Sequence, residues 1–597
     1  MKKIAKFQSF EEQSSPKYGP KRLTSLRREL KSLGLAGFLI PRSDMYQGEI
    51  VAPVDERLSW LTGFTGSAGF CVVLMKKAGV FVDGRYRVQV KNQTNKVFTP
   101  VDWPETTLVS WLSNNMSFGE SIGFDPWLHS LSEIEKTQNE LADLGIKLRP
   151  IANPIDKLWK DQPNNPTSKA FVYDIKYSGQ SHKEKRISLA NQLKQKNHAA
   201  TIITLPENIA WILNIRGNDI AHVPIVQSVG ILYSDSSFDL FINLEKVADI
   251  KPHLGTEVRC NRMEDFPKQL RKLKGKVRID PNSIPFAVAN ILKKNKIIFH
   301  AKDDLVALSK AKKNSIEILQ AREAHNRDAA AMCEFLCWLD NQDIEKISEI
   351  DVVIALEEFR RVNTELLDIS FDTISASGPN AALPHYRVTK VSNRMLKQGQ
   401  VLLVDSGGQY LDGTTDITRT IAVGVQEKYV CEAFTRVLKG MISISCLKFP
   451  RGTAGRDIDA FARSPLWAAG QDFSHGTGHG VGHFLSVHEG PQRISPKSSI
   501  PLEEGMIVSN EPGYYLEGKF GIRIENLLLV TAVQKSNFLE FKTLNFVPID
   551  KRMIVKKMLN KEEVSWLNHY HQICFDNNFN RVNPMVGKWL KKATSRL

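Results

Sequence analysis

The segment VLLVDSGGQYLDGTTDITRTIAV, residues 401–423, predicts a hairpin that carries two carboxylates into apolar surroundings. An apolar strand runs into Asp405, the Asp-Gly pair of LDGT (411–414) is typical of a tight turn, and a returning strand follows Asp416. Such a hairpin brings the two aspartates near each other, although eleven positions separate them. A carboxylate at the inner end of an apolar strand is costly unless it is paired or bound to a cation. The hairpin therefore indicates an ion pair or a metal site.

Two further carboxylates have the same apolar context. Glu511 ends the apolar run of MIVSNEPGYY (506–515), and Glu525 lies inside GIRIENLLLV (521–530). No alternation of polar and apolar residues explains Glu525 as a surface residue, and Arg523 would lie on the same strand face. A surface Arg–Glu pair is the simpler interpretation, but such apolar flanks rarely face water.

The segment HGTGHGVGHFLSVHEG, residues 475–490, contains four histidines, of which His475, His479 and His483 recur at every fourth residue. On a helix this spacing would place imidazoles on one face, as in a zinc motif, but each glycine inside a helix costs about 1 kcal/mol. Glycine at every second position instead suits an extended segment that another strand or a ligand approaches closely. Along such a strand the three histidines lie too far apart for one small metal site. At most one or two of them bind a metal, and a glycine loop without any ligand is the alternative.

Four carboxylates and one imidazole, if they converge, form a dinuclear metal site. The empty cluster would repel itself and raise its own pKa values, and two divalent cations would neutralise it. Oxygen ligands with one imidazole and no thiolate favour Mn, Co, Fe or Zn as a catalytic ion over a structural zinc site. Two bridged metals would hold a water between them as hydroxide, which is a nucleophile for hydrolysis near neutral pH.

The composition is that of an ordinary globular protein. The chain has 597 residues, enough for about three or four domains, and is 42% hydrophobic and 24% charged. It has no apolar run of about 18 residues, and its first residues lack the apolar core of a secretory signal, so we expect no membrane partner and no secretion. The seven cysteines are scattered, odd in number and without a CxxC pair, which favours the reducing cytoplasm.

The formal net charge of +15 raises the question of nucleic-acid binding. The lysines are spread along the chain rather than gathered in one block, and no zinc finger, basic zipper or basic-and-aromatic RNA motif is visible. We interpret the charge as a solvated surface and expect no nucleic-acid partner.

The first half of the chain repeats one pattern of basic helix, short apolar strand and a tryptophan-bearing segment that ends at glycine. The first copy covers residues 21–63 and the second covers residues 185–217. This diverged repeat predicts two related α/β domains in tandem, and the polar stretch at 158–169 is the candidate linker.

The second half begins with long helical patterns from residue 311, continues with short strands rich in glycine, and ends in about fifty helical, polar residues. We predict domain boundaries that give residues 1–160, 161–308, 309–548 and 549–597.

Taken in order, VDSGGQYLDGTTDITRT, HGTGHGVG, VHEGP, SNEPGYY and GIRIEN resemble the pita-bread metallopeptidases. Within that group the sequence is most similar to the aminopeptidase P family in its long, three-domain cytosolic form. SDMYQGEIVAPVDERLSWLTGFTGSAGF and VDGRYRVQV look like the first domain of that family, and ENIAWILNIRGNDI looks like its second. The resemblance covers nearly the whole chain. It implies an α/β (α+β) fold of two tandem creatinase-N-like α/β domains, a pita-bread catalytic domain and a short helical C-terminal extension.

The resemblance also implies the metal ligands by matching position, with Asp416 and Glu525 bridging two ions. The five matched ligands are Asp405, Asp416, His479, Glu511 and Glu525. Arg523 is expected to support these ligands from behind without binding metal itself.

Three more histidines match positions that act on substrate. His385, in LPHYR, matches a histidine near the scissile bond, and His475 matches one that lines the substrate pocket. His488, in VHEGP, matches the histidine that assists proton movement or stabilises the tetrahedral intermediate, and Glu511 is expected to shuttle a proton while it remains a ligand. His483 has no matching role, and we interpret it as a packing residue or as support for a ligand.

The activity that the resemblance implies is removal of the N-terminal residue from peptides with proline in second position. Two divalent ions per chain are expected, Mn²⁺ first and Co²⁺, Fe²⁺ or Zn²⁺ as alternatives, and the family often forms homodimers. A prolidase restricted to Xaa-Pro dipeptides is the alternative within the fold. A metal-free pita-bread module that binds basic or nucleic-acid partners is the alternative from another class, which five competent ligand positions disfavour.

Overall fold

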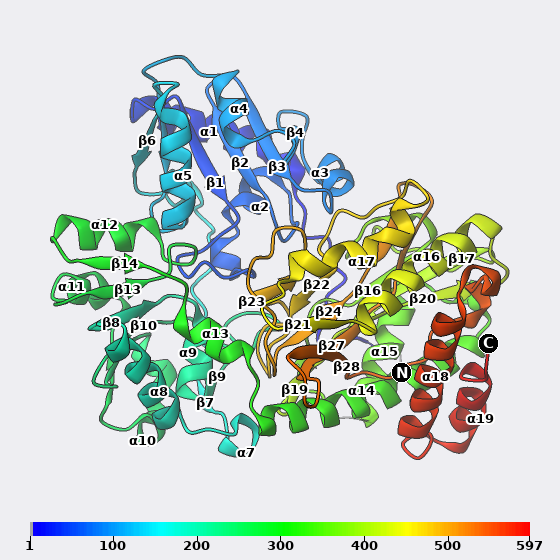
Figure 1. Ribbon diagram of the computed structural model, residues 1–597. Coiled ribbons are helices and arrows are strands. Elements are labelled where there is room, and N and C mark those ends of the chain that lie inside the picture. The colour runs from blue at the N-terminus through cyan, green and yellow to red at the C-terminus, as the bar shows by residue number, and fades with distance from the viewer. Residues whose placement is uncertain (1–3, 364) are drawn as a thin grey trace. The chain divides into compact units, whose positions relative to one another are not determined.

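The computed structural model describes residues 4–363 and 365–597, which form two compact units (Figure 1). The tandem unit is Gln13–Ala307, and the C-terminal unit is Leu308–Leu597 together with the start of the chain up to Glu12. Within these described ranges, no helix has the length and the apolar character needed to cross a membrane. The domain boundaries expected after residues 160, 308 and 548 stay predictions.

The tandem unit contains the same six-stranded sheet twice. In both sheets the pairings run, from one edge to the other, parallel, antiparallel, antiparallel, parallel and parallel. The first sheet has the order β4 (Thr99–Asp102), β3 (Ala78–Val82), β2 (Phe70–Leu74), β1 (Gly37–Pro41), β5 (Ser121–Phe124), β6 (Lys147–Pro150). The second has the order β12 (Val258–Asn261), β11 (Phe238–Phe241), β10 (Val229–Tyr233), β8 (Ala200–Ile203), β13 (Val277–Ile279), β14 (Phe299–Ala301).

The predicted repeat of helix, strand and tryptophan segment is confirmed. Helix α1 (Gly19–Ser32) precedes β1 and α2 (Arg57–Thr62) follows it, while α8 (His182–Gln195) precedes β8 and α9 (Pro206–Leu213) follows it. The leucines of α1 are fully buried because they recur at helical spacing and face the sheet. The start of α8 is fixed by a capping box between Ser181 and Glu184.

The C-terminal unit packs two pairs of helices onto antiparallel strands (Figure 1). Helices α14 (Ser315–Asp340) and α15 (Glu349–Asn363) share a core with strands β17 (Gln400–Ser406) and β20 (Ile417–Val423). Helix α17 (Gly455–Trp467) shares another core with the sheet ordered β21 (Lys448–Pro450), β28 (Phe538–Thr543), β27 (Asn526–Ala532), β24 (Ile507–Asn510), β22 (Gly478–Gly480), β23 (Glu489–Ile494). Helix α16 (Lys428–Ser445) packs on β26 (Phe520–Arg523) and on the C-terminal helix α18 (Lys561–Asn578), which α19 (Pro584–Ala593) follows.

The start of the chain packs within the C-terminal unit. The backbone N–H of Lys6 donates to Oε1 of Glu357 at 2.6 Å, and Gln8 exchanges two hydrogen bonds with the backbone of Thr373 at 2.8 and 3.2 Å. These contacts fix residues 6–8 within the C-terminal unit. No local pattern could reveal the pairing, because Lys6 and Glu357 are 351 positions apart.

The hairpin predicted over residues 401–423 is confirmed. Strands β17 and β20 pair antiparallel from Gln400 opposite Val423 to Ser406 opposite Ile417. The LDGT turn joins the short strands β18 (Gly408–Tyr410) and β19 (Gly413–Thr414), which form a second hairpin inside the first. Asp405 stands opposite Thr418, so its neighbour across the ladder is two residues from Asp416.

The histidine segment is extended where the glycines predicted it. Strand β22 lies between β23 and β24, and these neighbours approach its backbone closely. A Cβ added to Gly478 would lie 1.9 Å from the carbonyl oxygen of Ser509, and one added to Gly480 would lie 2.3 Å from that of Glu489. Only glycine fits at these two positions, so the composition of the segment follows from sheet packing.

Replacing Gly478 with alanine should lower the free energy of unfolding of the C-terminal unit by about 1–3 kcal/mol, because the new methyl group overlaps the Ser509 backbone. Urea unfolding followed by circular dichroism measures the change. Gly476→Ala is the matched control, since its nearest atoms would lie at 3.3 Å and can move by a few tenths of an ångström. Equal losses in the two variants would contradict the steric explanation.

Candidate metal centre

Four of the five matched ligands are brought together by direct contacts. Nε2 of His479 on β22 lies 3.4 Å from Oδ2 of Asp416 and 3.5 Å from Oε1 of Glu511. The ligand atoms of Asp416, His479 and Glu525 all lie within 4.8 Å of one another, which is the spacing of a metal site. Asp416 precedes β20, Glu511 follows β24, and Glu525 lies between β26 and β27. Asp405 joins them through its negative charge, which raises the pKa of Asp416, Glu511 and Glu525.

The carboxylates destabilise one another's ionised forms. Burial and then the charge of Asp405 raise the pKa of Asp416 far above the usual range of an aspartate. Burial and then the charge of Asp416 do the same to the pKa of Glu525, and burial raises the pKa of Glu511. A cation in the cluster would reverse these shifts, because it stabilises the ionised carboxylates.

Two buried carboxylate oxygens of this cluster have no hydrogen bond among the described residues. Oδ1 of Asp405 and Oδ1 of Asp416 are buried, and among the described residues no donor reaches either atom. The second oxygen of Asp405 is bonded to Arg523, so each aspartate presents one free acceptor. Buried acceptors are rarely left unpaired, and anionic oxygens beside an imidazole suit a divalent ion of the Mn, Co, Fe or Zn type. The residues present therefore fit a metal.

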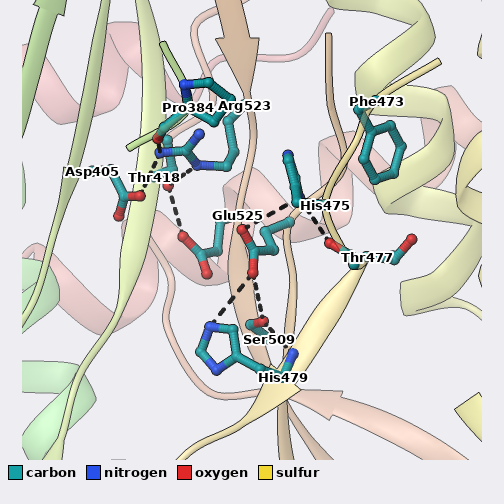
Figure 2. A network of polar contacts seen from close by, with 12 residues as sticks. Pro384, Asp405, Thr418, Phe473, His475, Thr477, His479, Ser509, Arg523 and Glu525 are labelled. Carbon is teal, nitrogen blue, oxygen red and sulfur yellow. Dashed lines mark hydrogen bonds and ion pairs between the residues drawn. The ribbon is translucent and has the colours of Figure 1, made fainter. Parts of the chain in front are cut away.

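His479 is held in the tautomer that a metal requires. Its Nδ1–H donates to the carbonyl of Gly480 at 2.9 Å, so Nε2 carries the lone pair that faces Asp416 and Glu511. The hydroxyl of Ser509 accepts the backbone N–H of His479 at 2.9 Å and contacts Oε1 of Glu511 at 3.3 Å. Figure 2 shows Ser509 beside the imidazole.

Arg523 lies next to Asp405 and neutralises this carboxylate (Figure 2). It is 2% exposed, and its Nη2 lies 2.5 Å from Oδ2 of Asp405. Its Nε donates at 3.2 Å to the hydroxyl of Thr418, which in turn donates to Oε2 of Glu525 at 2.7 Å. A surface pair between Arg523 and Glu525 is therefore wrong, since both side chains are buried and Asp405 is the partner of the arginine.

His475 has both ring nitrogens engaged by the protein. Its Nδ1–H donates to the carbonyl of Gly476 at 2.8 Å, and its Nε2 accepts from the hydroxyl of Tyr515 at 2.9 Å. That hydroxyl also accepts from Nη1 of Arg523 at 2.5 Å. Both ring nitrogens of His475 are therefore occupied by protein groups, and its role in the substrate pocket stays a prediction.

The remaining predicted histidines lie at different depths. The ring of His488 packs edge-on against that of His479 with centroids 4.3 Å apart, so it borders the cluster. His385 follows Pro384, whose carbonyl accepts from Arg523 at 3.2 Å, and is half-buried. His483 is 3% exposed, in keeping with a packing or supporting residue.

Glu489 anchors the chain directly after His488. Its two oxygens accept from Nζ of Lys310 at 2.7 Å and Nζ of Lys313 at 2.5 Å, and all three side chains are buried. Glu489 is the first residue of β23, and His488 directly precedes that strand. The clamp thus fixes the backbone that carries His488.

Several supporting residues escaped the sequence analysis. Thr418 lies two residues after Asp416, and Ser509 lies two residues before Glu511. Residues at this spacing share a strand face, and this was the signal that could have identified them. Lys310 and Lys313 belong to a lysine-rich run, KAKKNS (310–315), whose composition is typical of an exposed surface. Only the distant Glu489 explains their burial.

The metal-free protein should lose stability as pH rises from about 4 through the raised pKa values of its carboxylates. The folded state holds protons on Asp416 and Glu525 that the unfolded state releases near its ordinary pKa, so the free energy of unfolding falls in this window. Thermal unfolding of the stripped protein between about pH 5 and pH 8 measures the slope. Asp416→Asn should flatten it, and an unchanged slope in that variant would contradict the assignment.

Glu489→Gln should destabilise the C-terminal unit by about 3–5 kcal/mol, because it leaves two buried ammonium groups without a counter-charge. Unfolding by urea measures the loss. Glu540→Gln is the control, since this partly exposed carboxylate pairs with exposed Lys542 and should contribute less than about 1 kcal/mol. A small effect at Glu489 would show that the lysines reach water.

Family models match nearly the whole chain. The Creatinase/Prolidase N-terminal domain matches residues 22–158, and a second model with that description matches residues 161–317. Metallopeptidase family M24 matches residues 320–532, and the C-terminal region of peptidase M24 matches residues 537–597. These matches confirm the predicted fold class of two creatinase-like domains, a pita-bread domain and a C-terminal extension.

Individual proteins agree with the family models. A protein of Laccaria bicolor named "Probable Xaa-Pro aminopeptidase P" is 37% identical, over 96% of this chain and 93% of its own. The crystal structure of an X-prolyl aminopeptidase from Caenorhabditis elegans, described as a cytosolic enzyme with a di-nuclear active site, is 33% identical. It covers 97% of this chain and 100% of its own with a TM-score of 0.93. A prolidase from Thermococcus sibiricus covers only 62% of this chain, at 25% identity and a TM-score of 0.50.

The tandem sheets, the carboxylate cluster with its single imidazole, and similarity over nearly the full length of both chains lead to one assignment. The chain belongs to metallopeptidase family M24, within its group of Xaa-Pro aminopeptidases P.

Proposed function

We propose that this protein is a dinuclear metallo-aminopeptidase that releases the N-terminal residue from peptides with proline in second position. The observation that carries the proposal is the convergence of buried carboxylates on Nε2 of His479. The names of the relatives, similar over nearly the whole chain, support the reaction and the substrate class.

The ligands in this proposal are Asp405, Asp416, His479, Glu511 and Glu525, with Asp416 and Glu525 bridging. The unpaired oxygens of Asp405 and Asp416 and the fixed tautomer of His479 support it. When bound, two divalent ions lower the pKa of a coordinated water toward neutrality and polarise the substrate carbonyl. We propose Mn²⁺ as the ion because four of the five donors are carboxylates and none is a thiolate.

The chain's own groups complete the site. We propose that His488, which borders the cluster, and His385 donate hydrogen bonds to the oxygen on which charge develops. Glu511 is 19% exposed at its side chain, which lets its carboxyl group pass a proton to the leaving proline nitrogen. His475, fixed by Tyr515, forms part of the wall that receives the substrate.

The preference for proline rests on the relatives rather than on a contact seen in this chain. Proline has no N–H and a fixed φ, so a pocket must accept a bond that most aminopeptidases reject. Coverage favours this assignment over a prolidase, since the prolidase from Thermococcus sibiricus matches 62% of this chain and the Caenorhabditis elegans aminopeptidase matches 97%. We further propose a cytoplasmic location, in line with the cytosolic description of that relative, and a homodimer, as the family resemblance implies.

Hydrolysis of Arg-Pro-Pro by the full-length protein tests the proposal. Metal-stripped protein should release no arginine, and added Mn²⁺ should restore release, because the cluster requires cations to ionise. Activity confined to the dipeptide Arg-Pro would instead indicate a prolidase. No hydrolysis with any divalent ion, in a folded protein, would favour a binding module.

The matched variants for this assay are Glu525→Gln and Glu517→Gln. The first removes a proposed bridging carboxylate and should reduce kcat/KM by at least about a thousandfold. The second changes an exposed carboxylate eight positions earlier and should leave hydrolysis unchanged. Full activity of Glu525→Gln would remove this residue from the metal site.

A further inference from the structure

Two buried side chains bind the backbone carbonyls of Asp416 and Glu525, the residues proposed to bridge the metals. Nδ2 of Asn545 donates to the carbonyl of Asp416 at 2.8 Å, and Nη1 of Arg419 donates to that of Glu525 at 2.6 Å. Asn545 also accepts the N–H of Leu527 at 2.9 Å. These bonds join β20 and β27 at the points where the two carboxylates leave them.

Arg419 links several backbone segments through hydrogen bonds and does not form an ion pair among the described residues. It is 2% exposed, and among the described residues no carboxylate lies within ion-pair distance of its guanidinium. Its donors instead reach six neutral oxygens at 2.6–3.2 Å, on Thr418, Glu525 (the carbonyl), Asn526, Val547, Pro548 and Tyr570. The rigid fork of an arginine suits such a fixed set of acceptors.

Residues of helix α18 bind Arg419 and the backbone of residues 546–549. The hydroxyl of Tyr570 accepts from Nη2 of Arg419 at 2.8 Å and donates to the carbonyl of Val547 at 2.8 Å. Nε2 of His571 accepts the N–H of Ile549 at 3.1 Å, and Nδ2 of Asn578 donates to the carbonyl of Phe546 at 2.8 Å. Residues 545–549 are therefore tied to α18 on one side and to the ligand strands on the other.

We infer that α18 is a positioning element of the metal centre. Through Tyr570 it orients Arg419 and residues 545–549, and these fix the backbone from which Asp416 and Glu525 extend. The C-terminal region thus contributes to metal binding although it supplies no ligand. This inference rests on the proposed function, because it takes Asp416 and Glu525 as ligands.

The hydroxyl of Tyr570 can be removed without disturbing the packing of its ring. The ring stacks on Trp566 with centroids 5.1 Å apart and contacts Phe546 at 5.7 Å, and phenylalanine preserves both contacts. Tyr570→Phe therefore isolates the link to Arg419. Tyr429→Phe is the matched control, because its hydroxyl bonds Tyr514 at 2.8 Å elsewhere in the same unit.

The experiment measures Mn²⁺ binding to metal-stripped, full-length protein by titration calorimetry, together with the midpoint of thermal unfolding without metal. Tyr570→Phe should weaken Mn²⁺ binding by about tenfold or more, because groups that orient ligands have effects of this size. Tyr429→Phe should bind as the native protein does. The metal-free midpoint should shift equally little in both variants, which separates ligand positioning from general stability.

Native affinity in folded Tyr570→Phe would overturn the inference, and so would an equal loss in Tyr429→Phe. Should Tyr570→Phe fail to fold, Asn545→Ala decides by the same titration, since it removes the bond to Asp416 directly. Native Mn²⁺ affinity in that variant also overturns the inference. If the native protein itself binds no Mn²⁺, the proposed metal centre fails, which distinguishes the two results.

Discussion

Repulsion among four neighbouring carboxylates, three of them buried, is the constraint on which the C-terminal unit depends. Asp405, Asp416, Glu511 and Glu525 lie together in an apolar interior, where each raises the energy of its ionised neighbours. Arg523 forms an ion pair with Asp405. The hydroxyl of Thr418 contacts Glu525, and that of Ser509 contacts Glu511. Arg523 balances one of the four negative charges, so three would remain if all four carboxylates were ionised. Divalent cations can neutralise this excess charge better than further protein groups can.

The surrounding backbone is built to resist that repulsion. Strand β22, which carries His479, packs so closely between β23 and β24 that only glycine fits at Gly478 and Gly480. This packing fixes the backbone that holds the imidazole beside the carboxylates. Glu489, held by Lys310 and Lys313, fixes the chain after His488. Asn545 and Arg419 bind the backbone carbonyls of Asp416 and Glu525, which leaves the acidic side chains of these two residues available.

Local patterns in the sequence were sufficient for the elements that carry the site. The hairpin of residues 401–423 follows from apolar runs around Asp-Gly, and the extended histidine segment follows from alternating glycines. Local patterns could not predict the residues that support the site, because the partners of these residues lie far away in the sequence. Arg419 meets Tyr570 151 positions away, and Lys310 meets Glu489 179 positions away. Charge favours the surface for Arg419, Lys310 and Glu489, and only their long-range contacts explain their burial.

The pairing of the chain's start with Glu357 and Thr373 has a consequence for biosynthesis. Residues 6–8 leave the ribosome long before their partners exist, and the whole tandem unit is translated in the interval. Domains fold as they emerge, so this short segment must wait, unpaired, while Gln13–Ala307 reaches its own structure. Docking of the segment therefore waits until residues 357 and 373 have been translated, and it closes a loop between positions 351 residues apart.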